Sequence, residues 1–362
     1  MIPAALQAEI AANAVCSVGP RADWARILGQ KQISAAFIGG SVTQGYMNLH
    51  VLESAYPAIT ADALREMGYD VQCTICAEAG MDSLAGNVLA DSVIMPKHPD
   101  LVVLEFAINE TTLQHSVLSF ESLLRRLVSL PEHPVVCVLI MRNANDYSCE
   151  SFMLPMAEHY GLPCISVRRG LNPAIGAGSL TWEDFADREG HPNPDGHALL
   201  AACLTELIHK ARSAESTDTA ADLPEPWLDA PFTSLHTVFP GDPCEWIETR
   251  AETIPRMEWY FRRAWQIDGE SGSFTLKCRC RAIILFFETN TLPEYGTVRL
   301  TLDGKAVRHP LMNGALLSGY SLYGWGNPRS IILLNQKTAQ EHVLTLEPTD
   351  GTFYLLACAV QE

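Results

Sequence analysis

The sequence predicts a doubly wound, mostly parallel α/β sheet followed by an all-β sandwich. Strand-like and helix-like segments alternate up to residue 211, and this order builds a parallel sheet. Residues 101–110 (LVVLEFAINE) are almost continuously apolar, as expected of a parallel strand covered on both faces. Beyond a polar stretch that contains several prolines, the chain changes to short strands separated by turns.

The first domain is predicted over residues 1–213, from apolar periodicity and from residues that begin or end helices. The helix over 56–67 has Pro57 in its first turn, where no N–H partner is needed, and Gly68 after its end. The segment 4–14 is Ala-rich and predicts another helix, and a short helical turn surrounds Trp24. The other predicted helices are 83–95, 120–130, 153–160 and 198–211, and the predicted strands are 33–38, 71–76, 101–110, 135–141 and 164–167.

A linker and a β domain are predicted for the rest of the chain. Residues 214–231 are rich in Ser, Thr, Ala and Asp and contain Pro224 and Pro226, a composition typical of linkers. Residues 232–362 are predicted to form the β-sandwich, in which Asp303-Gly304 is a strong hairpin signal. The predicted strands are 274–280, 283–289, 297–302, 330–334, 342–346 and 353–360.

Composition and charge exclude several classes of function. The net charge of −17 leaves no basic patch for nucleic acid and disfavours binding to anionic membranes. The N-terminus lacks the pattern of a signal peptide, and no run of about 18 apolar residues predicts a membrane span. Several of the eleven cysteines lie in apolar runs, which favours free thiols in a reducing cytoplasm. Cys73 and Cys76 are better interpreted as buried thiols than as a metal or redox pair, because no second pair follows them.

Three polar or glycine-containing turns follow three different predicted strands. Ser41 follows the first strand after Gly39 and Gly40, Gly80 follows the second, and Asn109 ends the third. Ligands of doubly wound sheets bind beyond the carboxyl ends of the strands, so we expect these three residues to lie near one another.

Ser41 and His191 are the candidate nucleophile and the candidate base of this chain. Ser41 stands at a glycine turn that can expose its hydroxyl and bring backbone N–H groups close to a reacting oxygen, or it can act as a helix N-cap. His191 lies in a loop rich in Asp, Gly and Pro before the last predicted helix, where it can deliver a base or fill a structural role. Nearby, Asp195 and His197 have helix capping and packing as their simplest interpretations.

The dispersed blocks of the first domain resemble those of the SGNH (GDSL-like) hydrolases. The segment 39–45 (GGSVTQG) is similar to the nucleophile block, and Gly80 matches the glycine of the second block. Residues 106–110 (FAINE) are similar to the third block, and His191-Pro192-Asn193 is similar to the last. The resemblance covers residues 33–211. It implies a flavodoxin-like sheet for this domain. Some carbohydrate esterases also carry a β-sandwich of the jelly-roll kind beside such a domain, which implies a jelly-roll-like sandwich for residues 232–362.

The resemblance implies a cofactor-free and metal-free serine ester hydrolase. Ser41 would attack an ester carbonyl, and His191 would take its proton and pass it to the leaving alcohol. The backbone N–H groups of Ser41 and Gly80 and the side chain of Asn109 would form the oxyanion hole.

Two departures from the family pattern leave the third catalytic residue open. The third block ends in Glu110 where the family usually has Asp. In the last block, the position three before His191 is Arg188, whereas the carboxylate Asp187 lies four before it. Asp187 can orient His191 if the loop bulges by one residue. The alternatives are Glu189, Asp184, a backbone carbonyl, or a Ser–His dyad.

The predicted function is removal of an acyl group, expected to be acetyl, from an oxygen of a carbohydrate or similar small polar substrate. The alternatives are a general short-chain or lysophospholipase-like esterase, an acyl transferase, and a non-catalytic sugar-binding protein on a hydrolase fold. Tyr320, Tyr323 and Trp325 lie in a Gly-rich loop, where they can stack on a sugar ring or pack at the edge of the sandwich. The predicted partner is a small-molecule ester, with an oligomer left open.

Overall fold

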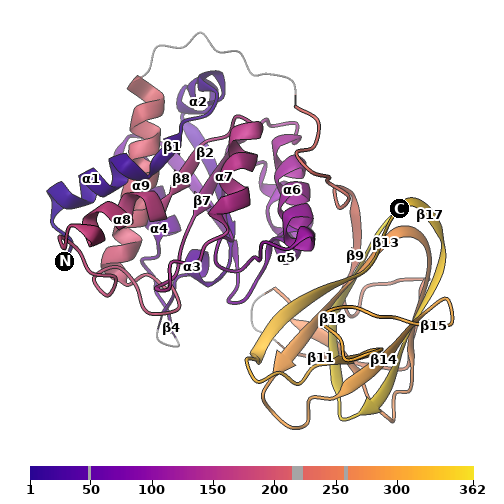
Figure 1. The fold of residues 1–362 in the computed structure, drawn as a ribbon. Helices are drawn as coiled ribbons and strands as arrows, with labels where there is room; N and C mark the ends of the chain where they lie inside the picture. Colours follow the sequence, from indigo (N-terminus) through magenta and orange to yellow (C-terminus); the bar gives the residue numbers. More distant parts are fainter. Residues whose placement is uncertain (48–49, 214–222, 257–259) are drawn as a thin grey trace. The chain divides into compact units, whose positions relative to one another are not determined.

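The chain folds into two compact units, Met1–Ala230 and Pro231–Glu362. A computed structural model describes all residues except 48–49, 214–222 and 257–259 (Figure 1). The linker predicted over 214–231 therefore lies partly outside the described residues, and residues 223–230 group with the first unit. No helix of the described chain is long and apolar enough to cross a membrane.

The first unit is built on a six-stranded sheet in the order β1-β8-β7-β6-β2-β5. Strands β2, β5, β6, β7 and β8 run parallel, and only β1 at the edge is antiparallel. The strands are β1 (Val15–Ser17), β2 (Gln32–Gly39), β5 (Asp70–Ala77), β6 (Leu101–Glu105), β7 (Val135–Ile140) and β8 (Cys164–Ser166). A two-stranded hairpin, β3 (Tyr46–Met47) and β4 (His50–Val51), lies in the loop after β2. The predicted doubly wound, mostly parallel sheet is confirmed.

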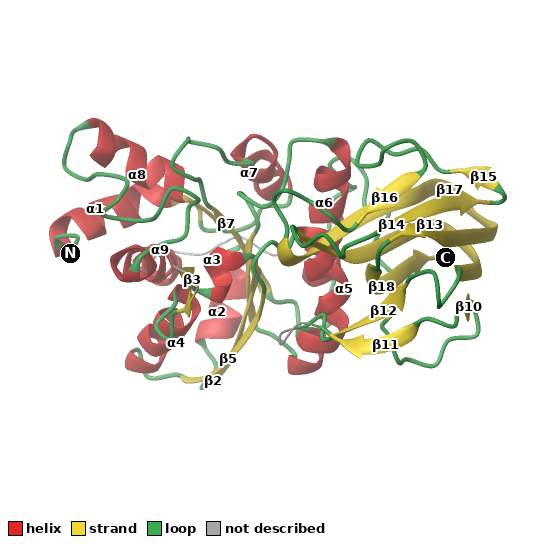
Figure 2. Cartoon of the chain, turned by 90° about the horizontal axis from the view of Figure 1, so that it is seen from below, coloured by secondary structure: helices red, strands yellow, loops and turns green. Residues whose placement is uncertain are grey.

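Helices cover both faces of this sheet. Figure 2 shows α1, α4, α8 and α9 on one side and α5, α6 and α7 on the other. The helices are α1 (Ala4–Ala14), α2 (Arg21–Leu28), α3 (Ser41–Gln44), α4 (Tyr56–Glu66), α5 (Ser83–Val93), α6 (Gln114–Val128), α7 (Glu150–His159), α8 (Val167–Gly176) and α9 (Pro194–Ser213), with a 3-10 turn η1 (Met95–Lys97). Strands β6 and β7 are buried along their whole length, as their apolar sequences predict.

Strand β1 and helix α8 are among the elements of the first unit that the sequence-based prediction lacks. Strand β1 has only three residues and pairs with β8 through a register shift, so it carries no repeating pattern. Helix α8 contains Gly170 and Pro173, which both disfavour a helix by local propensity. It forms because it packs tightly on α1: a Cβ atom on Gly170 would lie 2.7 Å from the carbonyl oxygen of Ile10. Tertiary packing thus overrides propensity here.

The second unit is an antiparallel β domain, as predicted, and none of its described residues lies in a helix. Its strands are β9 (Leu235–Val238), β10 (Ile247–Glu248), β11 (Glu252–Pro255), β12 (Arg263–Ile267), β13 (Phe274–Asn290), β14 (Thr297–Leu302), β15 (Lys305–Ala306), β16 (Leu316–Ser318), β17 (Trp325–Asp350) and β18 (Phe353–Gln361). Apolar side chains from β12, β13, β14, β17 and β18 gather in one core that includes Ile267, Phe274, Leu285, Leu300 and Leu344.

The structure adds strands β9, β10, β11, β12, β15 and β16 to those predicted, and it joins two pairs of predicted strands. The separate strands predicted over 274–280 and 283–289 form the single strand β13, and those over 330–334 and 342–346 lie in the single strand β17. The pairing of β13 with β17 shifts register between Cys280 and Ala282, and such an irregularity interrupts the apolar alternation that marks a strand in sequence. The hairpin turn is confirmed: Asp303 and Gly304 join β14 to β15 with φ angles of 52° and 73°.

Candidate active site

The loops that carry Ser41, Gly80 and Asn109 leave three adjacent strands at the same level of the sheet. Strand β2 lies between β6 and β5, and its last residue, Gly39, is paired with Glu105 of β6 and with Ala77 of β5. The three loops therefore begin side by side at the carboxyl edge, where a doubly wound sheet binds its ligands.

Ser41 follows two glycines whose missing side chains leave room for the neighbouring loops. A Cβ atom on Gly39 would lie 2.1 Å from Thr43 Oγ1, and one on Gly40 would lie 2.4 Å from Asn109 Oδ1. Gly40 is the N-cap of the short helix α3, and Ser41 is the first residue inside it. The structure thus does not use Ser41 as the N-cap, which was the alternative interpretation from sequence.

The side chain of His191 lies against the Ser41 hydroxyl. Its Nε2 atom is 2.9 Å from Ser41 Oγ, and both residues are largely buried, with exposed fractions of 9% and 5%. The ring edge of Tyr46 flanks the imidazole, with ring centroids 5.2 Å apart. A buried hydroxyl within hydrogen-bond distance of an imidazole is the arrangement by which a histidine can act as general base on a serine.

Asp187 lies on the other side of the imidazole. Its Oδ2 atom is 3.0 Å from His191 Nδ1, while Oδ1 accepts hydrogen bonds of 2.9 Å from the backbone N–H groups of Glu189, Gly190 and His191. Gly190 has a φ of +103°, a conformation that glycine adopts without strain. This turn takes up the additional residue between the carboxylate and the histidine.

The other carboxylates considered from sequence are placed differently. Glu189 Oε2 is 3.8 Å from His191 Nδ1, but this side chain is 82% exposed and its carboxylate is therefore solvated. Asp184 lies earlier in the loop, and its carboxylate accepts hydrogen bonds from the backbone N–H and the hydroxyl of Thr181. Asp187 is thus the carboxylate that the fold holds in place beside His191.

Gly80 occupies a tight turn that is hydrogen-bonded to helix α3, the helix that contains Ser41. The N–H of Met81 donates to the carbonyl of Glu78 at 3.0 Å, and Gly80 has a φ of +80°, as the third residue of a type II turn requires. Gln44 of α3 accepts a hydrogen bond of 3.0 Å from the N–H of Ala79. Gln44 therefore joins the Ser41 helix to the Gly80 turn, a role the sequence analysis missed. Its burial behind the nucleophile block is visible only in the fold.

Asn109 lies in the third loop and faces the turn that precedes Ser41. Its Oδ1 atom is buried and has no hydrogen-bond partner among the described residues. The side chain packs directly on Gly40, the residue before Ser41. The Asn109 amide therefore lies where its Nδ2 atom can donate a hydrogen bond to an oxygen atom bound next to Ser41 Oγ.

Glu110, which departs from the family pattern, is a buried structural residue. Its Oε1 atom accepts a hydrogen bond of 2.7 Å from the N–H of Ser83, at the start of α5. Burial, with a further contribution from nearby Asp82, raises the pKa of Glu110 to about 7. The Tyr147 hydroxyl donates to the Glu110 carbonyl. Glu110 thus ties the Asn109 loop to the helix that follows Gly80.

A second set of buried, hydrogen-bonded polar side chains lies beneath helix α3. Thr43 Oγ1 is 2.9 Å from the hydroxyl of Tyr56 and donates to Glu105 Oε2 at 3.3 Å. Full burial raises the pKa of Glu105 to about 8, so the carboxyl group is largely protonated at neutral pH. His197 accepts a 3.2 Å hydrogen bond from the N–H of Tyr56, and burial lowers its pKa to about 4. His197 therefore has the packing role expected from sequence.

The Cys-x-x-Cys segment lies within strand β5. Burial raises the pKa of Cys73 to about 11 and raises that of Cys76 further, which suppresses the thiolate forms that metal binding and redox chemistry need. All eleven cysteines are free.

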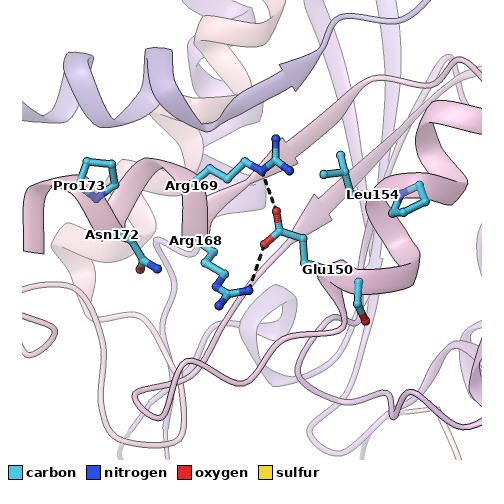
Figure 3. Close-up of a pocket in the computed structure, with 8 residues that line it drawn as sticks. Glu150, Leu154, Arg168, Arg169, Asn172 and Pro173 are labelled. Carbon is cyan, nitrogen blue, oxygen red and sulfur yellow. Dashed lines mark hydrogen bonds and ion pairs between the residues drawn. The ribbon is translucent and has the colours of Figure 1, made fainter. Parts of the chain in front are cut away.

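A separate pocket of about 630 Å³ lies between α7 and α8, and none of the predicted site residues lines it. Figure 3 shows Arg168 and Arg169 of α8 reaching toward Glu150 of α7. Arg169 Nε donates to Glu150 at 2.9 Å, and Arg168 forms a longer ion pair of 3.7 Å. Arg168 is also paired with Asp146, so each of the two guanidinium groups already has a carboxylate partner.

Comparisons with known proteins show which solved structures share this fold. No family model matches the chain, and no curated protein sequence matches it either. Two solved structures of a two-domain esterase active on acetylated mannans, one of them co-crystallised with mannopentaose, are similar in structure. Each of the two structures is 20% identical to this chain in sequence. The alignments cover 97% of this chain and 98% of the esterase chain, with TM-scores of 0.85 and 0.86. The chain therefore has the fold of that two-domain esterase, in which an α/β domain is followed by a β domain.

Proposed function

We propose that the chain is a serine esterase that removes acetyl groups from acetylated carbohydrates. The observation that carries this proposal is the series of contacts from Ser41 Oγ to His191 Nε2 and from His191 Nδ1 to Asp187 Oδ2, at 2.9 and 3.0 Å. The proposed nucleophile, base and orienting carboxylate are thus within hydrogen-bond distance of one another.

The proposed reaction uses only residues of this chain. His191 Nε2 takes the proton of Ser41 as Oγ attacks the ester carbonyl, and Asp187 stabilises the imidazolium that forms. The N–H groups of Ser41 and Gly80 and the amide of Asn109 bind the oxyanion. The alcohol leaves with the proton from His191, and water then releases the acid from Ser41 by the same steps. No cofactor or metal takes part.

The substrate class rests on two observations. The structurally similar esterase acts on acetylated mannans and matches both units of this chain. In the β domain, Tyr323 is 81% exposed and Trp325 is 60% exposed, so their ring faces are available for stacking on sugar. These exposures also disfavour the alternative that the two rings only pack at the edge of the domain. The eleven free cysteines support a reducing, cytoplasmic location.

A general short-chain esterase is the second candidate, and acyl-chain length separates the two. We would compare 4-nitrophenyl acetate with the octanoyl ester, and acetate release from acetylated oligosaccharides with release from a simple alkyl acetate. The proposal predicts preference for the acetyl ester and for the sugar acetate. Faster turnover of the octanoyl ester would favour the lysophospholipase-like alternative. Transfer of acetyl to an added sugar instead of water would identify an acyl transferase.

A further inference from the structure

The loop after β7, residues 141–149, packs against the loop that carries Asp187 and His191. Gly190 faces this loop so closely that a Cβ atom there would lie 3.2 Å from the Arg142 carbonyl oxygen and 3.3 Å from Asn143 Cα. The N–H of Ala144 donates to the carbonyl of Arg188 at 3.4 Å. The loop after β7 therefore forms a wall for the turn that orients the imidazole.

Arg142 makes the side-chain part of this contact. Its guanidinium carbon lies 4.6 Å from the centre of the Trp182 ring, and the two side chains are only 7% and 8% exposed. A cation over an indole face is attracted to the ring, and more strongly when both groups are removed from water. The indole N–H of Trp182 in turn donates to the carbonyl of Asp187 at 2.6 Å. The ring thus connects Arg142 to the backbone of the orienting carboxylate.

The charge of Arg142 is compensated within the same loop. Arg142 Nη1 is 2.7 Å from Asp146 Oδ1, and Asp146 also accepts from Arg168 Nε at 3.0 Å. These arginines lower the pKa of Asp146 to about 2, so the carboxylate remains charged. Asp146 has a φ of 58°, in a turn where the Asn143 side chain accepts from the N–H of Tyr147. The fold holds this aspartate in an uncommon conformation, from which it anchors Arg142.

We propose that Arg142 is a positioning residue for catalysis, which holds Asp187 at His191 through the ring of Trp182. This inference rests on the proposed function, since it assigns a role in the same site. Arg142 does not touch the reacting atoms. It restrains the turn that keeps Asp187 Oδ2 within 3.0 Å of His191 Nδ1. A displacement of about 1 Å in such a turn can cost about 100-fold in rate.

The test uses the full chain and 4-nitrophenyl acetate, with kcat and KM measured separately. Arg142→Gln removes the charge, and we expect kcat to fall about 10- to 100-fold with little change in KM. Arg142→Lys should recover most of the activity, because Nε of Arg142 has no hydrogen-bond partner among the described residues and a single ammonium can replace Nη1. The matched control is Arg125→Gln, which removes another cation stacked on a ring, that of Tyr160 at 5.6 Å.

Epistasis identifies the route of the effect. If Arg142 acts through Asp187, the double variant Arg142→Gln/Asp187→Ala is no slower than Asp187→Ala alone. Trp182→Phe keeps the ring but loses the N–H donor, so it should reproduce the loss in kcat even if Arg142→Gln folds poorly. The inference is overturned if the kcat of Arg142→Gln is as little changed as that of Arg125→Gln, or if Arg142→Lys does not recover kcat. It is also overturned if the losses in kcat of Arg142→Gln and Asp187→Ala multiply in the double variant. Persistence of activity in Ser41→Ala would instead refute the proposed function itself.

Discussion

Replacing Gly40 by alanine is expected to disable the proposed oxyanion hole without touching any reacting group. The new Cβ would stand 2.4 Å from Asn109 Oδ1, whereas ordinary contacts begin at 3.4 Å, so the amide must retreat by about 1 Å. Gly40 has a φ of −92°, outside the left-handed region, so the contact with Asn109 is the main obstacle to a side chain. Loss of one oxyanion donor costs about 3–4 kcal/mol, or a factor of roughly 100 to 1,000 in kcat.

The assay for this prediction is the steady-state hydrolysis of 4-nitrophenyl acetate, with thermal unfolding measured in parallel. Gly176→Ala is the matched control, because no atom lies within 4 Å of a Cβ at that position of α8. Asn109→Ala should lose a similar factor, and adding Gly40→Ala to it should cost little more, since both changes remove the same donor. Wild-type kcat in a folded Gly40→Ala variant, or a fully multiplicative loss in the double variant, would refute the reasoning.

Three further predictions concern the carboxylates and the β domain. Asp187→Ala should lower kcat by several orders of magnitude, about 10⁴-fold in related triads, whereas Glu189→Ala should stay near wild type; equal losses would restore Glu189 as the orienting group. The pKa of Glu105 is raised from 4.5 to about 8, so the folded state holds this proton at pH values where the unfolded state has lost it. The contribution of Glu105 to the free energy of unfolding therefore decreases as the pH rises from 4.5 to about 8. Glu105→Gln should therefore gain stability relative to wild type as pH rises from 5 to 8, by at most about 1.4 kcal/mol per pH unit in denaturant unfolding; a pH-independent difference would contradict this. Trp325→Ala should raise KM for acetylated oligosaccharides but not for 4-nitrophenyl acetate, and an unchanged KM for both would argue against sugar stacking.

The parts of the site that sequence could predict are those tied to strand ends. Ser41, Gly80 and Asn109 each follow an apolar run, and a parallel sheet brings such positions to one edge, so their proximity follows from topology. The turn of Gly190 could only be inferred as a bulge, because its φ of +103° depends on hydrogen bonds to Asp187.

The parts that sequence could not predict depend on contacts between distant segments. Helix α8 forms because Gly170 fits against α1, although Gly170 and Pro173 disfavour a helix by local propensity. Arg142 acquires a role only when the fold places Trp182 beneath its guanidinium, forty residues along the chain. Gln44 is polar in a short helix, and its contact with Ala79 requires β2 and β5 to be neighbours.

The most direct test of the central claim is the rate of 4-nitrophenyl acetate hydrolysis by the full chain compared with Ser41→Ala. Ser92→Ala, an exposed serine on α5, serves as the control for loss of a hydroxyl. We predict that kcat falls by at least about 1,000-fold in Ser41→Ala and is unchanged in Ser92→Ala. Equal rates for wild type and Ser41→Ala would contradict the assignment of Ser41 as the nucleophile of a serine esterase.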